Sequence, residues 1–194
     1  MIRAIVLAAG ASSRMGRPKA LLPAGDRSFV GRILGALRLG GAGTAVVVVR
    51  PGQQAVIDEV VAAGGRAVVN PRADDGQLSS LIAGLDAVDG PAVDGLLVTL
   101  VDVPLIQPDT VTTLIDRAAK SRAPILRAVH RGRHGHPVIF KRSVFDALRR
   151  ADPALGAKAV LRAHAVEDVD VDDPHIADDV DTPEDLDRLF GRDR

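Results

Sequence analysis

The sequence contains no cysteine among its 194 residues. This absence excludes a disulfide framework, a thiolate metal site and a nucleophilic thiol. It agrees with a reducing environment, and we therefore expect a cytoplasmic protein.

Aromatic residues are scarce as well, with four Phe, no Trp and no Tyr. The chain therefore offers almost no stacking platform for unpaired bases and no aromatic belt for a bilayer interface. The 25 basic and 25 acidic residues cancel, which removes a general attraction to polyanions. No apolar run approaches the ~20 residues of a membrane span. We expect neither a nucleic-acid partner nor a membrane partner.

What is present suits a globular core, because apolar residues make up 46% and charged residues 26% of the chain. Two independent domains would be cramped at this length. The sequence shows no repeat, linker or low-complexity tract. We therefore expect a single domain spanning residues 1–194.

Near-continuous apolar runs recur along the chain and are typical of strands buried on both faces. They are 2–7, 45–49, 67–69, 96–101 and 125–129. Between them lie apolar residues at helical spacing, such as Phe29, Ile33 and Leu37. The alternation predicts a three-layer α/β/α fold with a mostly parallel, Rossmann-like open sheet. The first run resembles a signal peptide superficially, but it is short and a motif-like loop follows directly.

The alternation of apolar runs and helical stretches ends after residue 130. The segment HRGRHGHPVIF predicts a small antiparallel hairpin that leads into a strand at 137–140 and lies as an excursion over the sheet. Helices are expected at 143–150 and 157–164. A final helix should begin with a capping box, in which Thr182 caps, Pro183 occupies the first turn and Asp185 completes the box.

The strongest chemical signal is the segment LAAGASSRMGRPK, residues 7–19, directly after the first strand. Loops at this position form the ligand edge of open α/β sheets. Its small residues let a ligand approach the backbone, and Arg14, Arg17 and Lys19 add cations. The spacing fits neither a Walker loop nor the GxGxxG fingerprint. The loop predicts a polyphosphate site, with a turn carrying solvated charges as the structural alternative.

Asp102 ends the apolar run LLVTLV. A carboxylate there either caps the following turn at Val103 or holds a metal ion beside the phosphates. Mg²⁺ is typically held by one or two carboxylates together with substrate phosphates. The phosphate loop favours the metal role, and Mg²⁺ is the cofactor that we expect.

The pattern LAAG-x-S-x-R-M-G-x-P-K-x-LLP resembles the signature loop of the nucleotidyltransferases that activate sugar phosphates, isoprenoid phosphates and molybdopterin. Further matching segments are Asn70-Pro71, Gly76 with Ser79-Ser80, Asp102-Val103-Pro104, Gly135-His136-Pro137, Gly156-Ala157-Lys158 and Asp181-Thr182-Pro183. The chain is most similar to the molybdenum cofactor cytidylyltransferases, the MocA-like branch of the MobA-like nucleotidyltransferase family. The resemblance implies the nucleotide-diphospho-sugar transferase fold.

The resemblance also implies residue roles. Catalysis would depend on Arg14, Lys19 and Asp102, and Mg²⁺ would be held by Asp102 and Asp181. The nucleotide would contact Leu7, Ala8, Ala9, Gly10, Arg14, Lys19, Asn70, Gly76, Ser79 and Ser80. The acceptor would lie at Gly135, His136 and Pro137. Structural alternatives stay open, since Ser79 and Ser80 could cap a helix and Asp181 could form a helix entry. His134 could be a hairpin tip, and a zinc site at His-x-His lacks a third ligand.

The implied reaction is nucleotidyl transfer from a nucleoside triphosphate to the terminal phosphate of a molybdopterin-type acceptor, with release of pyrophosphate. Ala9 resembles the cytidylyl-transferring members, since guanylyl-transferring relatives commonly carry a second Gly there, and we therefore favour CTP. A molybdoenzyme or a maturation chaperone would be the macromolecular partner. The alternatives are use of GTP, a sugar phosphate or other phosphorylated alcohol as acceptor, and a non-catalytic protein that binds nucleotide or hands over the cofactor.

Overall fold

The computed structural model describes residues 1–11 and 15–191. Within them, seven strands form one sheet in the order β5-β4-β1-β6-β8-β7-β9. The strands are β1 (Ile2–Leu7), β4 (Val46–Val49), β5 (Arg66–Val69), β6 (Gly95–Leu100), β7 (Ile125–His130), β8 (Arg133–Lys141) and β9 (Val166–Asp170). A separate two-stranded antiparallel sheet consists of β2 (Pro23–Ala24) and β3 (Arg27–Ser28). Every pairing in the large sheet is parallel except those of β8.

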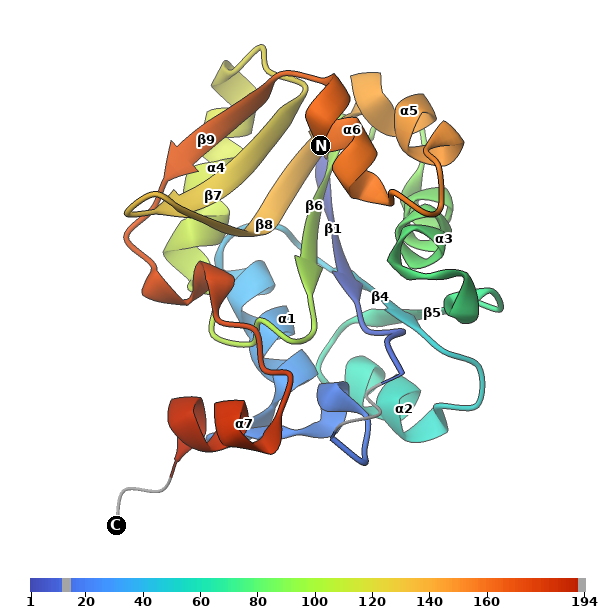
Figure 1. The fold of residues 1–194 in the computed structure, drawn as a ribbon, viewed down its shortest axis with the longest axis vertical. Helices are drawn as coiled ribbons and strands as arrows, with labels where there is room; N and C mark the ends of the chain where they lie inside the picture. Colours follow the sequence, from blue (N-terminus) through green and yellow to red (C-terminus); the bar gives the residue numbers. More distant parts are fainter. Residues whose placement is uncertain (12–14, 192–194) are drawn as a thin grey trace.

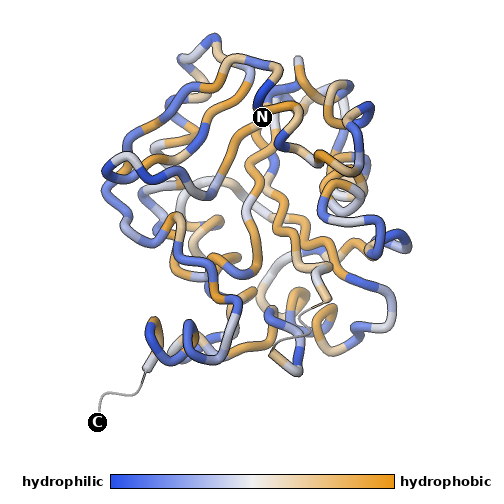
Figure 2. Tube along the Cα trace, viewed as in Figure 1, coloured by the Kyte–Doolittle hydropathy of each residue, from blue (hydrophilic) through white to orange (hydrophobic). Residues whose placement is uncertain are grey.

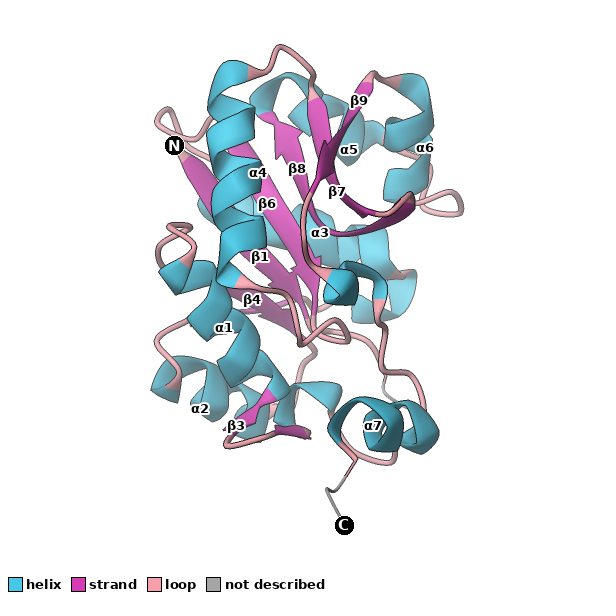
Figure 3. Cartoon of the chain, turned by 90° about the vertical axis from the view of Figure 1, so that its left-hand side faces the viewer, coloured by secondary structure: helices cyan, strands magenta, loops and turns pink. Residues whose placement is uncertain are grey.

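Helices cover both faces of the large sheet (Figure 3). One face carries α1 (Phe29–Leu39), α2 (Gln54–Ala62) and α4 (Pro108–Lys120), and the other carries α3 (Gln77–Val88), α5 (Phe145–Arg150) and α6 (Ala157–Ala163). Short 3₁₀ helices η1 (Lys19–Leu21), η2 (Ala73–Asp75), η3 (Arg142–Val144) and η4 (Pro174–Ala177) connect them, and α7 (Pro183–Phe190) ends the fold. The predicted three-layer α/β/α class is confirmed.

The pleat of β1 explains the two cores. Ala4 and Val6 pack with α1 and α4, whereas Ile5 and Leu7 pack with α3. Successive side chains of a strand point to opposite faces, so a strand covered on both sides is apolar at every position. Figure 2 shows this as continuous hydrophobic colour along the central strands.

The hairpin after residue 130 differs from its predicted position. β7 and β8 form the expected antiparallel pair, but β8 lies inside the large sheet between β6 and β7, where the sequence predicted an excursion over it. The physical reason is burial on two sides. Ile139 packs into the α1 and α4 core while Val138 and Phe140 pack into the α3 and α5 core. A strand with apolar residues on both faces is stabilised within a sheet that helices cover on both sides.

The carboxyl ends of the central parallel strands point to one end of the molecule, toward α7 (Figure 1). The predicted capping box begins α7, because the Thr182 hydroxyl accepts from the Asp185 N–H at 3.2 Å and the Asp185 carboxylate accepts from the Thr182 N–H at 3.0 Å. The Phe190 ring packs 5.5 Å from that of Phe29, between centroids. The C-terminal segment is thereby held beside the ends of the strands.

In the part of the chain that the structure describes, no helix combines the length and the apolar character that crossing a bilayer requires.

Candidate active site

The loop after β1 begins the site. The Ala8 N–H donates to the Val48 carbonyl at 2.9 Å, so this amide extends the sheet pairing and is not available to a ligand. Ala9, Gly10 and Ala11 follow and line a cavity of about 490 Å³. Leu7 also lines it. Arg14, for which the sequence predicted a role in catalysis and nucleotide binding, lies outside the described residues.

Lys19 lies at the start of η1, and its side chain is 11% exposed. Its ammonium donates to Asp181 Oδ1 at 2.6 Å and to Asp102 Oδ2 at 3.5 Å. Three residues that the sequence interpretation selected from distant parts of the chain therefore meet at one point. The same three side chains line the 490 Å³ cavity.

Backbone hydrogen bonds bring Asp181 to this point. The Val180 N–H donates to the Asp102 carbonyl oxygen at 2.8 Å. The Asp185 carboxylate accepts from the Asp181 N–H at 3.1 Å, and the Thr182 hydroxyl together with this N–H lowers the pKa of Asp185. Asp181 thus lies at the entry to α7 and faces the site at the same time, so its two predicted roles are compatible.

The charges suit a divalent cation. Two carboxylates surround one ammonium, and Asp102 Oδ1 is buried with no hydrogen-bond partner among the described residues. Asp179 is nearby, and burial, followed by the charges of Asp102 and Asp181, raises the pKa of its carboxyl group. Within the described residues, no group of three or more His, Cys, Asp or Glu side chains could hold a metal alone. The donor set fits Mg²⁺ or Mn²⁺ that shares its remaining positions with phosphates and water.

The predicted residues after β5 divide into two groups. Asn70 is buried, and its amide donates to the hydroxyls of Ser79 at 2.9 Å and Ser80 at 3.0 Å. The Ser79 hydroxyl donates to the carbonyls of Arg72 and Gly76. Asn70 and Ser79 therefore hold the loop that precedes α3, whereas Gly76 and Ser80 line the cavity.

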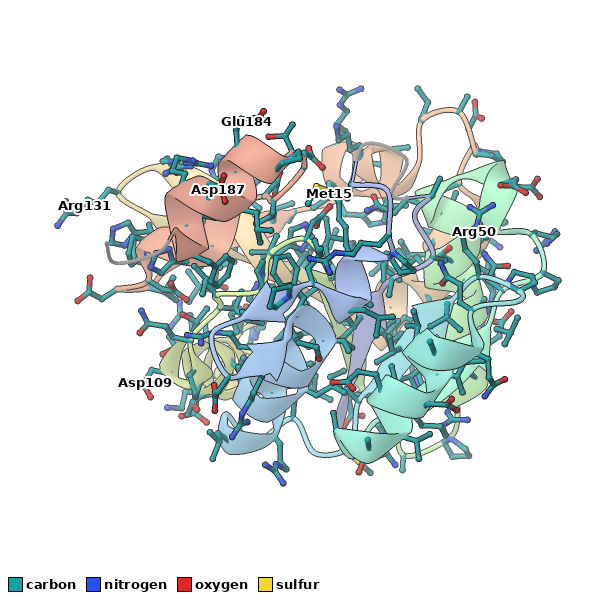
Figure 4. The ribbon with its side chains drawn as sticks, turned by 90° about the horizontal axis from the view of Figure 1, so that it is seen from below. Met15, Arg50, Asp109, Arg131, Glu184 and Asp187 are labelled. Atoms are coloured by element: carbon teal, nitrogen blue, oxygen red, sulfur yellow. The ribbon has the colours of Figure 1, made fainter. Side chains whose placement is uncertain are left out.

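Arg50 also lines this cavity, and the sequence interpretation missed it. It follows β4 directly, and its guanidinium donates to the Ala9 carbonyl at 3.3 Å and to the Asp74 carboxylate. Figure 4, which looks at the carboxyl ends of the central strands, shows Arg50 and Met15 on this face, while Arg131 points away at the margin. The signal was available, because a residue after β4 reaches the same sheet edge as the loop that was predicted to bind phosphates.

A second cavity of about 720 Å³ shares Leu7, Gln77 and Leu100 with the first. Gly135 and His136 line it, whereas Pro137 is not part of its lining. Its walls are apolar where α3 faces the sheet, and its polar lining residues are Gln77, Arg127, His134, His136, Lys158 and Asp179. The two cavities adjoin at these three shared residues, and Lys19 and Asp102 line the first cavity alone.

His136 is buried, and this burial lowers the pKa of its imidazole below the usual 6.5, against the opposing effects of the Val98 carbonyl and the Asp102 charge. Nδ1 lies 3.4 Å from the Val98 carbonyl oxygen. A carbonyl accepts hydrogen bonds and does not donate them, so Nδ1 carries the proton and Nε2 is an acceptor in the neutral ring. His136 therefore offers a lone pair to a ligand N–H or O–H.

The lowered pKa predicts a dependence of stability on pH. Below pH 6.5 the unfolded chain binds a proton at His136 that the folded chain does not bind, so this residue destabilises the fold as the pH falls. We expect the free energy of unfolding of the wild type to decrease more between about pH 7.5 and about pH 5.5 than that of His136→Gln. Urea unfolding at both pH values measures the difference. Identical decreases in the two proteins would contradict the assignment.

The sheet is open and mostly parallel, and a small-residue loop, a lysine and paired carboxylates lie at one edge of it. These features define the class of protein: a nucleotidyltransferase with the nucleotide-diphospho-sugar transferase fold. The family model of the MobA-like NTP transferase domain matches residues 4–169. The chain belongs to the MobA-like NTP transferase family.

Similar proteins cover nearly the whole chain. Nicotine blue oxidoreductase of Paenarthrobacter nicotinovorans is 33% identical over 97% of this chain and 96% of its own length. The crystal structure of Rv0371c from Mycobacterium tuberculosis H37Rv has a TM-score of 0.84 at 30% identity and covers 99% of both chains. A complex of Rv0371c with manganese has a TM-score of 0.80 at 31% identity and covers 97% of both chains.

Proposed function

We propose that this protein transfers the nucleoside monophosphate part of CTP to the terminal phosphate of a molybdopterin-type acceptor and releases pyrophosphate, as a MocA-like member of its family. The contact of Lys19 with Asp102 and Asp181 carries the proposal. It lies in the first cavity, which shares Leu7, Gln77 and Leu100 with the second. A nucleotide in the first cavity and a phosphorylated acceptor in the second would bring their phosphates together there.

The chemistry needs alignment more than proton transfer. An oxygen of the acceptor phosphate attacks the α-phosphorus, the new P–O bond forms, and the bond from the α-phosphorus to the bridging oxygen of pyrophosphate breaks. A phosphate monoester is mostly dianionic at neutral pH because its second pKa is about 6. The protein therefore needs no nucleophilic side chain or strong base, and its work is to position two anions and stabilise the leaving group.

Each side chain has a place in this scheme. Lys19 binds the triphosphate, together with the proposed Arg14, and residues 9–11 lie against the nucleotide. Asp102 and Asp181 would hold Mg²⁺, which supplies positive charge to the triphosphate when bound. Gly135 and neutral His136 would line the acceptor site, where Nε2 accepts a hydrogen bond from the acceptor body.

Ala9 supports the preference for CTP, since its methyl group narrows the slot that the nucleobase would enter. Ala9 is buried and lines the cavity. A smaller base is accommodated there with less displacement of the loop. The acceptor assignment rests on the Gly-His-Pro motif and on the second cavity, whose apolar walls and polar lining suit a heterocycle that carries a phosphate.

The direct test is incubation of the protein with molybdopterin, Mg²⁺ and each of the common ribonucleoside triphosphates in turn. We expect pyrophosphate release with CTP and a product whose mass is that of the cytosine dinucleotide of molybdopterin. A reaction that prefers GTP, or that proceeds only with a sugar phosphate as acceptor, would replace this substrate assignment. Nucleotide binding without pyrophosphate release would favour a non-catalytic protein that binds the nucleotide or hands a finished cofactor to another protein.

The relative named as an oxidoreductase raises a second candidate, an oxidoreductase that acts at the same cavities. Two carboxylates around one lysine favour the transferase, because they suit a metal ion with a triphosphate. Omission of the divalent cation separates the two candidates. Pyrophosphate release that stops without the cation supports transfer, whereas a change in substrate oxidation state without pyrophosphate would support the oxidoreductase.

A further inference from the structure

We infer that the Arg50–Asp74 ion pair recognises the hydrogen-bonding edge of the nucleobase and thereby selects the nucleotide. This inference rests on the proposed function, because it assigns the part of the same cavity that the phosphates leave open. Arg50 and Asp74 both line the 490 Å³ cavity. Arg50 follows β4 and Asp102 follows β6, and β1 lies between these two strands.

The sheet topology sets the distance. β4, β1 and β6 are neighbours with parallel pairing, and Arg50, residues 9–11 and Asp102 lie just beyond their carboxyl ends. Adjacent strands are about 4.8 Å apart, so the backbones that carry Arg50 and Asp102 are about 10 Å apart across the edge. A ribose and its 5′-phosphate bridge such an interval. With the phosphates at Lys19 and Asp102, the base reaches Arg50.

The charge beside Arg50 and Asp74 suits an uncharged base better than a polyphosphate. The Asp74 carboxylate neutralises the Arg50 guanidinium. The walls beside the pair are formed by small residues, Ala9, Gly10 and Ala11 on one loop and Ala73 and Gly76 on the other. Small residues on both sides leave a slot for a planar ring.

The Arg50–Asp74 pair has donor and acceptor groups that can form further hydrogen bonds with a base. Within the described part of the chain, Arg50 uses two of its five side-chain N–H groups, one with the Ala9 carbonyl and one with Asp74 Oδ1. Asp74 Oδ2 accepts no hydrogen bond within the described part of the chain, and the Asp74 side chain is 87% exposed. A guanidinium donor beside a carboxylate acceptor matches the adjacent acceptor and donor groups on a base edge. A base with these groups in the opposite order is rejected.

Two variants distinguish recognition of the base from a structural role, in which Arg50 only stabilises the neighbouring loops through its contacts with Ala9 and Asp74. Arg50→Met removes the donors, and Asp74→Asn replaces the acceptor with an amide of the same shape. Asp75→Asn is the matched control, because Asp75 is the exposed neighbour of Asp74 and does not line the cavity. Thermal melting of each variant verifies that it is folded.

The measured quantity is kcat/KM for pyrophosphate release with each of the common ribonucleoside triphosphates. We expect the preference for the best nucleotide over the next to fall at least about tenfold in Arg50→Met and Asp74→Asn, and to stay unchanged in Asp75→Asn. A common loss for every nucleotide would overturn the inference, since bracing of the loop or contact with phosphate affects all of them alike.

Failure of the proposed function would look different. If the wild type releases no pyrophosphate with any nucleotide, the transferase proposal fails, and titration calorimetry of the same triphosphates then measures selectivity in binding. Selective binding by the wild type that is lost in Arg50→Met and Asp74→Asn still supports base recognition by the pair. Equal affinity of the wild type for all bases overturns it.

Discussion

Replacing Asp102 with Asn is expected to slow pyrophosphate release at least about a hundredfold, because one lost electrostatic contact of this kind costs on the order of 3 kcal/mol. Asp102 follows β6 and lines the first cavity, and its buried Oδ1 has no hydrogen-bond partner in the described residues. The amide keeps the shape and removes the charge that a divalent cation requires. Lys19→Met should lose as much, since its ammonium binds the same carboxylate.

The comparison needs a folded protein and a matched substitution. Asp187→Asn on the exposed side of α7 changes the same charge away from both cavities, and wild-type turnover is expected there. The double variant of Lys19 and Asp102 should lose less than the product of the single losses, because the residues act as one unit. Near-normal turnover of folded Asp102→Asn would remove this residue from the site.

Replacing Gly135 with Ala is expected to destabilise the fold by about 1–3 kcal/mol or more. A Cβ at this position would lie 2.1 Å from the Ile176 carbonyl oxygen and 2.4 Å from its carbonyl carbon. These are backbone atoms, which cannot rotate away, so η4 or β8 must move. The segment after η4 leads to Asp181, and we therefore expect a loss of activity together with the loss of stability.

Urea unfolding and the pyrophosphate assay measure both effects. Gly90→Ala is the control, because no atom lies within 4 Å of the position of its added Cβ and its φ is not in the left-handed region. Wild-type stability of Gly135→Ala would show that the contact with Ile176 relaxes at no cost. Gly135 would then matter for the acceptor alone, as the sequence interpretation suggested.

The predictable parts of the molecule depend on local patterns. The strands 2–7 and 125–129, the capping box at Thr182 and the loop that carries Lys19 are each read from neighbouring residues. The proximity of Lys19 and Asp102 was also expected, because the carboxyl ends of parallel strands meet at one edge. For Asp181 the expectation came from the resemblance to the nucleotidyltransferases. The catalytic and binding roles of these residues remain predictions that the variants above test.

Other features could not be predicted from the sequence because they depend on contacts between distant segments. The sequence shows an apolar strand at 137–140 but not that β8 enters between β6 and β7. It shows a glycine in a motif but not the Ile176 backbone against it. Arg50 became visible only when the structure placed it against the Ala9 carbonyl and Asp74.

By itself, the sequence determined the layered α/β class, the small-residue loop after β1 and the capping box of α7, because strand periodicity, small-residue turns and helix caps act over a few residues. The tertiary structure alone decided the place of β8, the sharing of Leu7, Gln77 and Leu100 by two cavities, and the pairing of Arg50 with Asp74. These features arise when strands and loops remote in the chain pack together, and the pattern of neighbouring residues does not encode which partners they meet.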